Sequence, residues 1–232
     1  MITFIEQILI AAGPVILAIT LHEAAHGYAA YALGDDTAKR LGRVSLNPLR
    51  HVDRVGTLLL PGALLLAQLL TVGRVMFMFG WAKPVPVNAS AFPNPRRGMM
   101  LVAAAGPAAN FVLAWLAALA LHVTGLLPAQ AAGIADTLIE VFVLANLVLG
   151  LFNLLPIPPL DGGRIVVGLL PERLAMVWAK LERAGIVLVL LVVFLLPRAL
   201  AEFGIQFDPV GHALNVGLPR VFDLVFRLAG HA

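Results

Sequence analysis

Cysteine is absent from this 232-residue chain, and charged side chains are scarce. Without cysteine there is no disulfide and no thiolate ligand, so any bound metal must be held by histidine and carboxylate side chains. Charged residues make up 12% of the chain and hydrophobic residues 60%, whereas a typical soluble domain has about 25% charged residues. So little polar surface cannot cover a water-facing globule of this size. The composition predicts an all-α, polytopic membrane protein.

Two further absences narrow the class. No basic cluster is interleaved with aromatic residues, although the net charge is +3, so we expect no nucleic-acid partner. The N-terminus lacks the basic stretch of a cleavable signal, and the apolar run after it is too long for one. We therefore expect this first run to remain as a membrane helix.

Four apolar runs are long enough to form helices that cross a membrane. They cover residues 4–33, 98–122, 137–155 and 184–200. A fifth run, 207–232, is apolar but contains two arginines and two histidines, so an interfacial helix and a last crossing are both open. We expect a helical bundle forming one membrane-embedded domain over 1–232, with a three-span catalytic core at about 4–164 and additional C-terminal helices over 165–232.

Lysine and arginine mark the loops that face the cytoplasm. They occur within residues 39–54, at Arg96 and Arg97, and between Arg164 and Arg183, whereas loop 123–136 contains none. This pattern places the N-terminus outside. It predicts a multi-pass protein of the bacterial plasma (inner) membrane.

Residues 56–72 form a shorter apolar run with basic residues on both sides. A run of this length cannot cross the bilayer twice, so we favour a re-entrant or membrane-surface element. The alternative is a single crossing that carries residues 74–97 outside. Within 74–87, alternating residues and prolines predict a short β-strand or extended edge.

The first apolar run contains the sequence HEAAH, with His22 and His26 four positions apart. On a helix both imidazoles lie on one face and can bind one metal ion. Glu23 then lies beside the open position of the metal, where a zinc-activated water needs a general base. Because ionisable side chains inside a span are costly, this group predicts a metal site within the membrane, nearer the cytoplasmic surface.

A catalytic zinc site needs three protein ligands, so one more is required. Asp161 follows a proline-rich stretch and precedes two glycines, a sequence typical of a tight turn. The run 137–155 ends just before it, on the side of the membrane where the first run also ends. Asp161 is therefore the candidate third ligand.

Four other polar residues are candidates for a role at the site or in the loops. Asn110 and Asn153 lie in apolar spans, where they either form interhelical hydrogen bonds or act as donors to a substrate strand or an oxyanion. His51 and Asp53 lie in a basic loop, where we expect surface solvation.

Three motifs in this order resemble the site-2 protease family of intramembrane zinc metalloproteases: HEAAH, then GPAAN at 106–110, then NLLPIPPLDGGR at 153–164. The resemblance spans about residues 22–164. It implies that His22, His26 and Asp161 bind one Zn²⁺ per chain and that Glu23 is the catalytic base. It also implies that Asn153 and Asn110 assist at the active site.

The linker GWAKPVPVN is similar to that of compact members of this family, in which a sheet-like element beside the active site pairs with an unwound substrate. No stretch is long or polar enough for the PDZ or CBS domains of many relatives. The chain departs from compact members at His51-Val52-Asp53-Arg54, where relatives often have His-x-Asp-Pro.

The expected function is hydrolysis of a peptide bond within or near a transmembrane segment of another membrane protein, by an enzyme embedded in the lipid bilayer. Two alternatives belong to other classes. A metal transporter would place ligands along a path through the bilayer, and a non-catalytic scaffold would bind metal without forming product.

Overall fold

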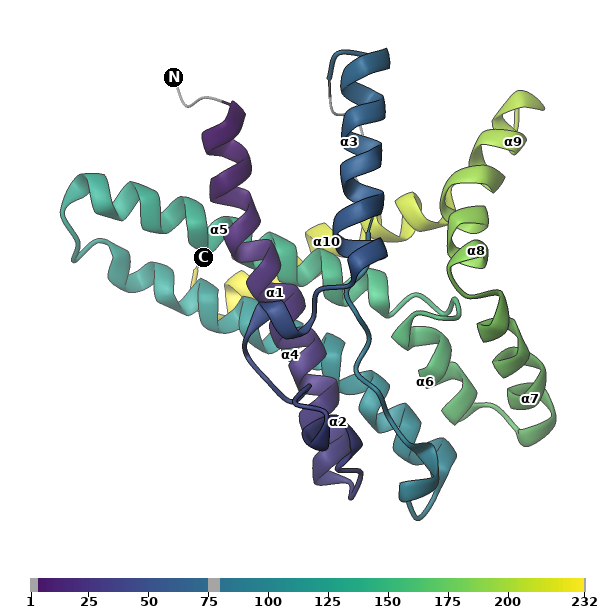
Figure 1. Cartoon of the computed structure of the whole chain (residues 1–232). Helices are drawn as coiled ribbons and strands as arrows, with labels where there is room; N and C mark the ends of the chain where they lie inside the picture. The colour runs from purple at the N-terminus through teal and green to yellow at the C-terminus, as the bar shows by residue number, and fades with distance from the viewer. Residues whose placement is uncertain (1–3, 75–79, 232) are drawn as a thin grey trace.

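Helices form all the regular structure in the part of the chain that this computed structural model describes, residues 4–74 and 80–231 (Figure 1). The predicted all-α class is confirmed for these residues. Within the described residues, three helices are long and apolar enough to cross a membrane, and they cover Arg54–Thr71, Pro95–Thr124 and Ala129–Asn153. A fourth crossing results if the pair Glu172–Ala184 and Val187–Glu202, bent by 86°, counts as one span.

The centre of the bundle consists of α1 (Phe4–Ala32), α4 (Pro95–Thr124) and α5 (Ala129–Asn153), each of which contacts the other two. Figure 1 shows α4 and α5 as a hairpin, with α1 lying across it. The buried positions of α4 are mostly small, which lets the three helices approach closely. Helix α1 matches the predicted range 4–33, and its crossing of the membrane stays a prediction.

Local signals explain where the central helices begin and end. The side chain of Asn94 caps α4 by accepting a hydrogen bond from the Arg97 N–H at 3.0 Å, and Pro95 occupies the first helical position, where no N–H is needed. Helix α5 ends at Asn153, three residues before Pro156. The predicted ranges 98–122 and 137–155 are therefore correct in kind but too short at their N-terminal ends.

The remaining helices surround this centre. Their bounds are α2 (Thr37–Arg40), η1 (Pro48–Arg50), η2 (Arg54–Leu59), α3 (Leu60–Thr71), η3 (Ala89–Ala91), α6 (Asp161–Leu169), α7 (Glu172–Leu181), η4 (Glu182–Ala184), α8 (Gly185–Leu190), η5 (Leu191–Leu195), α9 (Leu196–Glu202) and α10 (Pro209–Leu228). The predicted run 184–200 is thus divided among α8, η5 and α9. Helix α10 packs on α4 and α5, and it is not among the candidate spans.

The segment that begins with η2 and α3 leaves the bundle and returns to its starting point (Figure 1). At its base the Trp81 N–H donates to the Gly56 carbonyl at 3.1 Å, and the Thr57 hydroxyl donates to the Trp81 carbonyl at 2.8 Å. A side chain at Gly56 would collide with the Trp81 ring, so only glycine permits this closure. Both flanks therefore lie on one side of the protein, which favours the re-entrant interpretation over a single crossing.

The predicted strand is not found in its described part. Residues 75–79 lie outside the described residues, and 80–88 form an extended segment without strand pairing. Its N–H groups bond instead to loop and helix groups: Lys83 donates to the His51 carbonyl at 2.8 Å, and Val85 donates to Glu23. Pro84 and Pro86 have no N–H to offer. Of the two alternatives predicted for 74–87, the described part 80–87 therefore takes the extended form and not the β-strand, because its partners are single groups rather than a second strand.

The closed base predicts the sidedness of the segment, and the natural absence of cysteine makes the test direct. Arg54→Cys and Lys83→Cys place thiols on exposed positions at its two flanks, and Leu126→Cys places one in the loop between α4 and α5. In oriented vesicles, an impermeant maleimide should label positions 54 and 83 from the same side and position 126 from the opposite side. Labelling of 54 and 83 from opposite sides would mean that the segment crosses the membrane.

Candidate metal centre

Helix α1 supplies His22, Glu23 and His26 from its C-terminal half. The two imidazoles lie one helical turn apart and meet edge to face, with ring centroids 4.6 Å apart. Both are buried against α4, where Gly106 leaves room for them. A Cβ atom at Gly106 would lie 2.5 Å from His26 Nε2 and 2.6 Å from His22 Cε1. The glycine of the GPAAN sequence is therefore required by the close approach of α4 to both rings.

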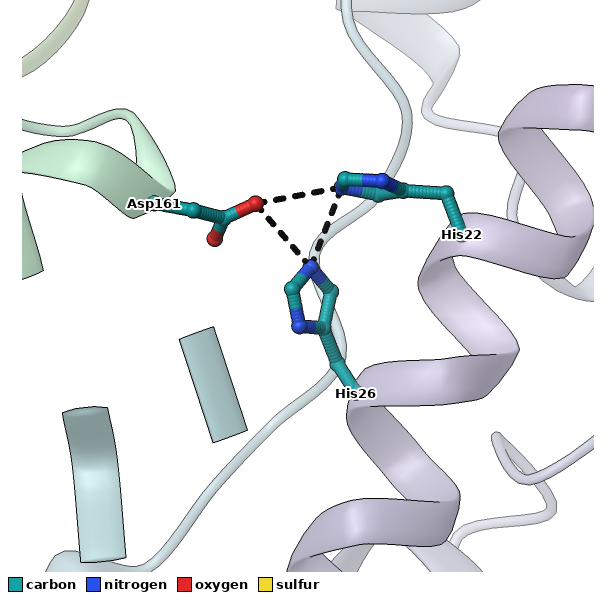
Figure 2. A group of neighbouring side chains, drawn as sticks. All are labelled: His22, His26 and Asp161. Carbon is teal, nitrogen blue, oxygen red and sulfur yellow. Dashed lines mark hydrogen bonds and ion pairs between the residues drawn. The ribbon is translucent and has the colours of Figure 1, made fainter. Parts of the chain in front are cut away.

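Asp161 faces the two imidazoles from a different helix, α6 (Figure 2). It is the first residue of α6 and follows a loop that returns from the end of α5. Added Cβ atoms at Gly162 and Gly163 would collide with the backbone of residues 154–155 and 157–158. These two glycines let the chain fold back closely enough to direct the Asp161 carboxylate toward α1.

The three side chains form a nearly equilateral triangle of ligand atoms (Figure 2). His22 Nε2 lies 3.1 Å from His26 Nε2, and Asp161 Oδ2 lies 3.2 Å and 3.3 Å from these two nitrogens. A tetrahedral zinc ion with bonds of about 2.0–2.2 Å places neighbouring ligand atoms about 3.3–3.6 Å apart. The edges of the triangle are close to that range.

The hydrogen bonds at Nδ1 of both histidines turn the two Nε2 atoms toward each other and toward Asp161 Oδ2. The Nδ1–H of His22 donates to Asn110 Oδ1 at 2.6 Å, and that of His26 donates to the Val102 carbonyl at 2.7 Å. Each neutral imidazole therefore presents an Nε2 lone pair. Asp161 Oδ2 is buried and accepts no hydrogen bond from any residue that the structure describes. Three electron pairs thus converge in a buried space, an arrangement that fits zinc.

Glu23 and the three candidate ligands line a cavity of about 650 Å³. The Glu23 carboxylate is half-buried, and its Oε2 accepts a hydrogen bond from the Val85 N–H at 3.2 Å. The rest of the lining is mainly apolar and includes Ile19, Trp81, Leu149, Phe152 and Val189. An acid–base group thus lies beside the candidate metal site, in a cavity suited to apolar side chains.

The extended segment 80–88 is held against the cavity at both ends. The buried Arg43 guanidinium donates to the carbonyl groups of Lys83 and Pro84, and also to that of Arg50. At the other end, Asp35 Oδ2 accepts from the Asn88 N–H at 2.6 Å. These contacts determine where the Val85 N–H meets Glu23.

The expectation of surface solvation is wrong for His51, whereas Asp53 is half-buried and keeps part of its surface exposed. The His51 side chain is buried, and its Nε2 bonds to the Ser45 carbonyl at 2.9 Å. Asp53 Oδ1 caps η2 by accepting from the Val55 and Gly56 N–H groups at 3.0 and 2.7 Å. Both residues shape the loop that supports segment 80–88, a role that local polarity alone does not reveal.

The two asparagines predicted to assist lie in different places. Asn153 lines the cavity, and its Nδ2 donates to the Leu149 carbonyl at 3.0 Å. Asn110 is fully buried behind His22, and its amide faces His22 and Asn146. Sequence reasoning missed Arg43 and Asn146. In the sequence, the only signal for Asn146 is a polar residue within an otherwise apolar run.

Comparison with known proteins places this geometry in a family context. The sequence model of peptidase family M50 matches residues 127–196. The chain is 42% identical over 217 residues to "Putative zinc metalloprotease YwhC" of Bacillus subtilis (strain 168), covering 91% of this chain and 90% of that protein. It is 35% identical over 182 residues to "Putative zinc metalloprotease Rip2" of Mycolicibacterium smegmatis, covering 76% of this chain and 64% of that protein. No solved structure matches the chain significantly.

The contact at Gly106 predicts a specific metal-binding defect. In Gly106→Ala the new methyl group would displace both imidazoles, so zinc affinity should fall by about tenfold or more, by analogy with other changes that misorient metal ligands. Zinc competition with a chromophoric chelator measures this. Gly133→Ala is the matched control, because nothing lies within 4 Å of the added Cβ atom. Equal affinity in both variants would show that the close approach at Gly106 is not needed for metal binding.

Proposed function

The chain belongs to peptidase family M50, the site-2 protease family of zinc metalloproteases, and from this we propose that it hydrolyses a peptide bond within or near a transmembrane segment of another membrane protein. The observation that carries the proposal is the convergence of His22, His26 and Asp161 beside Glu23. These groups lie at a cavity within a bundle whose helices are apolar enough to cross a membrane.

His22, His26 and Asp161 would hold one Zn²⁺ per chain in this proposal. When bound, the ion supplies Lewis-acid chemistry: it polarises a carbonyl group and makes a water molecule acidic enough to react at neutral pH. The two histidines bind through Nε2, because each Nδ1 is already engaged by a hydrogen bond. The ligand set matches the three protein ligands and open position of catalytic zinc sites.

Glu23 has the role of general base and then of general acid. Its carboxylate takes a proton from the attacking water while the water oxygen bonds to the scissile carbonyl carbon. As the carbon–nitrogen bond breaks, the same proton passes to the leaving amine. The Val85 N–H holds one carboxylate oxygen, Oε2, at the edge of the cavity, which leaves the other oxygen for the reacting water.

The lining of the cavity suggests the substrate. Apolar side chains such as Leu149, Phe152 and Val189 fit the residues of a transmembrane segment. A helical substrate hides its amides, so it must unwind before cleavage, and an extended substrate strand can pair with the backbone of segment 80–88. Because Pro84 and Pro86 lack an N–H, that edge offers mainly carbonyl acceptors. Asn153 lines the same cavity, where its amide can contact the substrate backbone.

The proposed function also has consequences for the domain organisation of the chain and for its location in the cell. We propose that residues 1–232 act as one membrane-embedded domain in which the catalytic residues lie within about 4–164, and that the C-terminal helices of 165–232 support it. The basic loops predict that the active site opens toward the cytoplasmic side of a bacterial plasma membrane. Water would reach Glu23 from that side.

The decisive experiment measures peptide-bond hydrolysis and zinc content separately. Glu23→Gln keeps the size of the side chain but removes the base, so hydrolysis should fall by about 10²- to 10⁴-fold while zinc content stays unchanged. The assay uses purified protein reconstituted with a model substrate that has one transmembrane helix, and product is followed by mass spectrometry. Glu140→Gln is the control, because Glu140 is an exposed glutamate of α5 outside the cavity.

The alternatives predict different results in the same vesicles. A scaffold would bind zinc and form no product with any substrate, even as the wild-type chain. A transporter would move zinc across the bilayer, and Glu23→Gln would change uptake rather than cleavage. If Glu23→Gln cleaves as fast as the wild type, the assigned mechanism is wrong.

A further inference from the structure

A chain of buried hydrogen bonds runs from the backbone of α5 to the metal-facing histidine of α1. Asn146 Nδ2 donates to the Phe142 carbonyl at 2.8 Å, and Asn146 Oδ1 accepts from Asn110 Nδ2 at 2.8 Å. Asn110 Oδ1 then accepts from His22 Nδ1 at 2.6 Å. Both asparagines are fully buried. Three helices are therefore connected by one line of polar groups inside an apolar bundle.

This line has only one chemically consistent direction. A backbone carbonyl can accept but cannot donate, so Asn146 must turn its NH₂ group toward Phe142. Its oxygen then faces Asn110, which must donate a hydrogen bond from its own NH₂ group. The oxygen of Asn110 is consequently directed at His22, where only an N–H can meet it. Reversing either amide would set two oxygens or two NH₂ groups against each other.

We propose that Asn146 is a positioning residue that, through Asn110, holds His22 in the tautomer with the proton on Nδ1. This tautomer leaves the Nε2 lone pair directed at His26 and Asp161, as zinc binding requires. The inference rests on the proposed zinc site, but it concerns metal binding rather than cleavage.

The tautomer of His26 is held in the same way, but by one hydrogen bond rather than by a chain of them. His26 Nδ1 donates directly to the Val102 carbonyl of α4 at 2.7 Å. No backbone carbonyl takes that place at His22, where Asn110 of α4 is the partner instead. An asparagine side chain can turn either its oxygen or its NH₂ group toward a histidine. Asn110 therefore selects one tautomer of His22 only if its own amide is held in one orientation. Asn146 holds it by accepting a hydrogen bond from Asn110 Nδ2.

The test measures metal affinity in the full-length chain without substrate. Asn146→Leu removes the acceptor for Asn110 and keeps the number and branching of the side-chain heavy atoms, and Zn²⁺ affinity should fall by about 10- to 100-fold. Asn146→Asp should retain affinity, because a buried, protonated carboxyl group can both accept from Asn110 and donate to Phe142. The ligand-field spectrum of the Co²⁺-loaded protein should change in Asn146→Leu and stay as wild type in Asn146→Asp.

A thermodynamic cycle separates positioning from packing. Because Asn146 acts through Asn110, adding Asn146→Leu to Asn110→Leu should weaken zinc binding no further than Asn110→Leu alone. Val143→Ala is the packing control: it removes a fully buried side chain from the same helix and should leave zinc affinity unchanged. If Asn146→Leu does not fold, Asn146→Ala replaces it in the cycle.

The proposal is overturned if the effects of the Asn146 and Asn110 variants simply add, or if Val143→Ala weakens zinc binding as much as Asn146→Leu. It is also overturned if Asn146→Leu keeps both wild-type affinity and the wild-type Co²⁺ spectrum. Failure of the cleavage proposal appears elsewhere, as absence of product from a chain that binds zinc normally.

Discussion

Three electron-pair donors converge in a buried space, and the rest of the structure depends on this constraint. His22 Nε2, His26 Nε2 and Asp161 Oδ2 lie 3.1–3.3 Å apart, and a hydrogen bond on the far side of each imidazole holds its Nδ1. Lone pairs that face one another in a low-dielectric interior repel each other, and a bound cation would offset that repulsion. The arrangement is that of a group of side chains able to hold a metal ion.

Close backbone approach makes that convergence possible. Gly106 lets α4 pass beside both imidazoles, and Gly162 with Gly163 lets the start of α6 fold back against the end of α5. In a membrane, where the bilayer provides no hydrophobic force between helices, such small residues are what allow tight packing. The glycines of the sequence motifs are thus as much a part of the site as the ligands are.

The segment over the cavity shows how tertiary contacts replace regular pairing. Residues 80–88 are extended, but their partners are the His51 carbonyl, the Glu23 carboxylate and the Arg43 guanidinium rather than a neighbouring strand. Arg43 is buried and carries a charge, so its contacts with backbone carbonyls are costly to break. Segment 80–88 is in this way held at a defined position beside Glu23.

The sequence alone determined the class of the protein and the identity of the candidate site. The scarcity of charge, the helical spacing of His22 and His26, and the turn residues after Asp161 are local features, and local features can be interpreted without a structure. Tertiary structure alone decided which groups surround that site. Asn110 meets His22 and Asn146 across three helices, and Arg43 meets Lys83 across 40 positions. The distance between such partners along the chain carries no periodic signal, so only the packing of the helices reveals them.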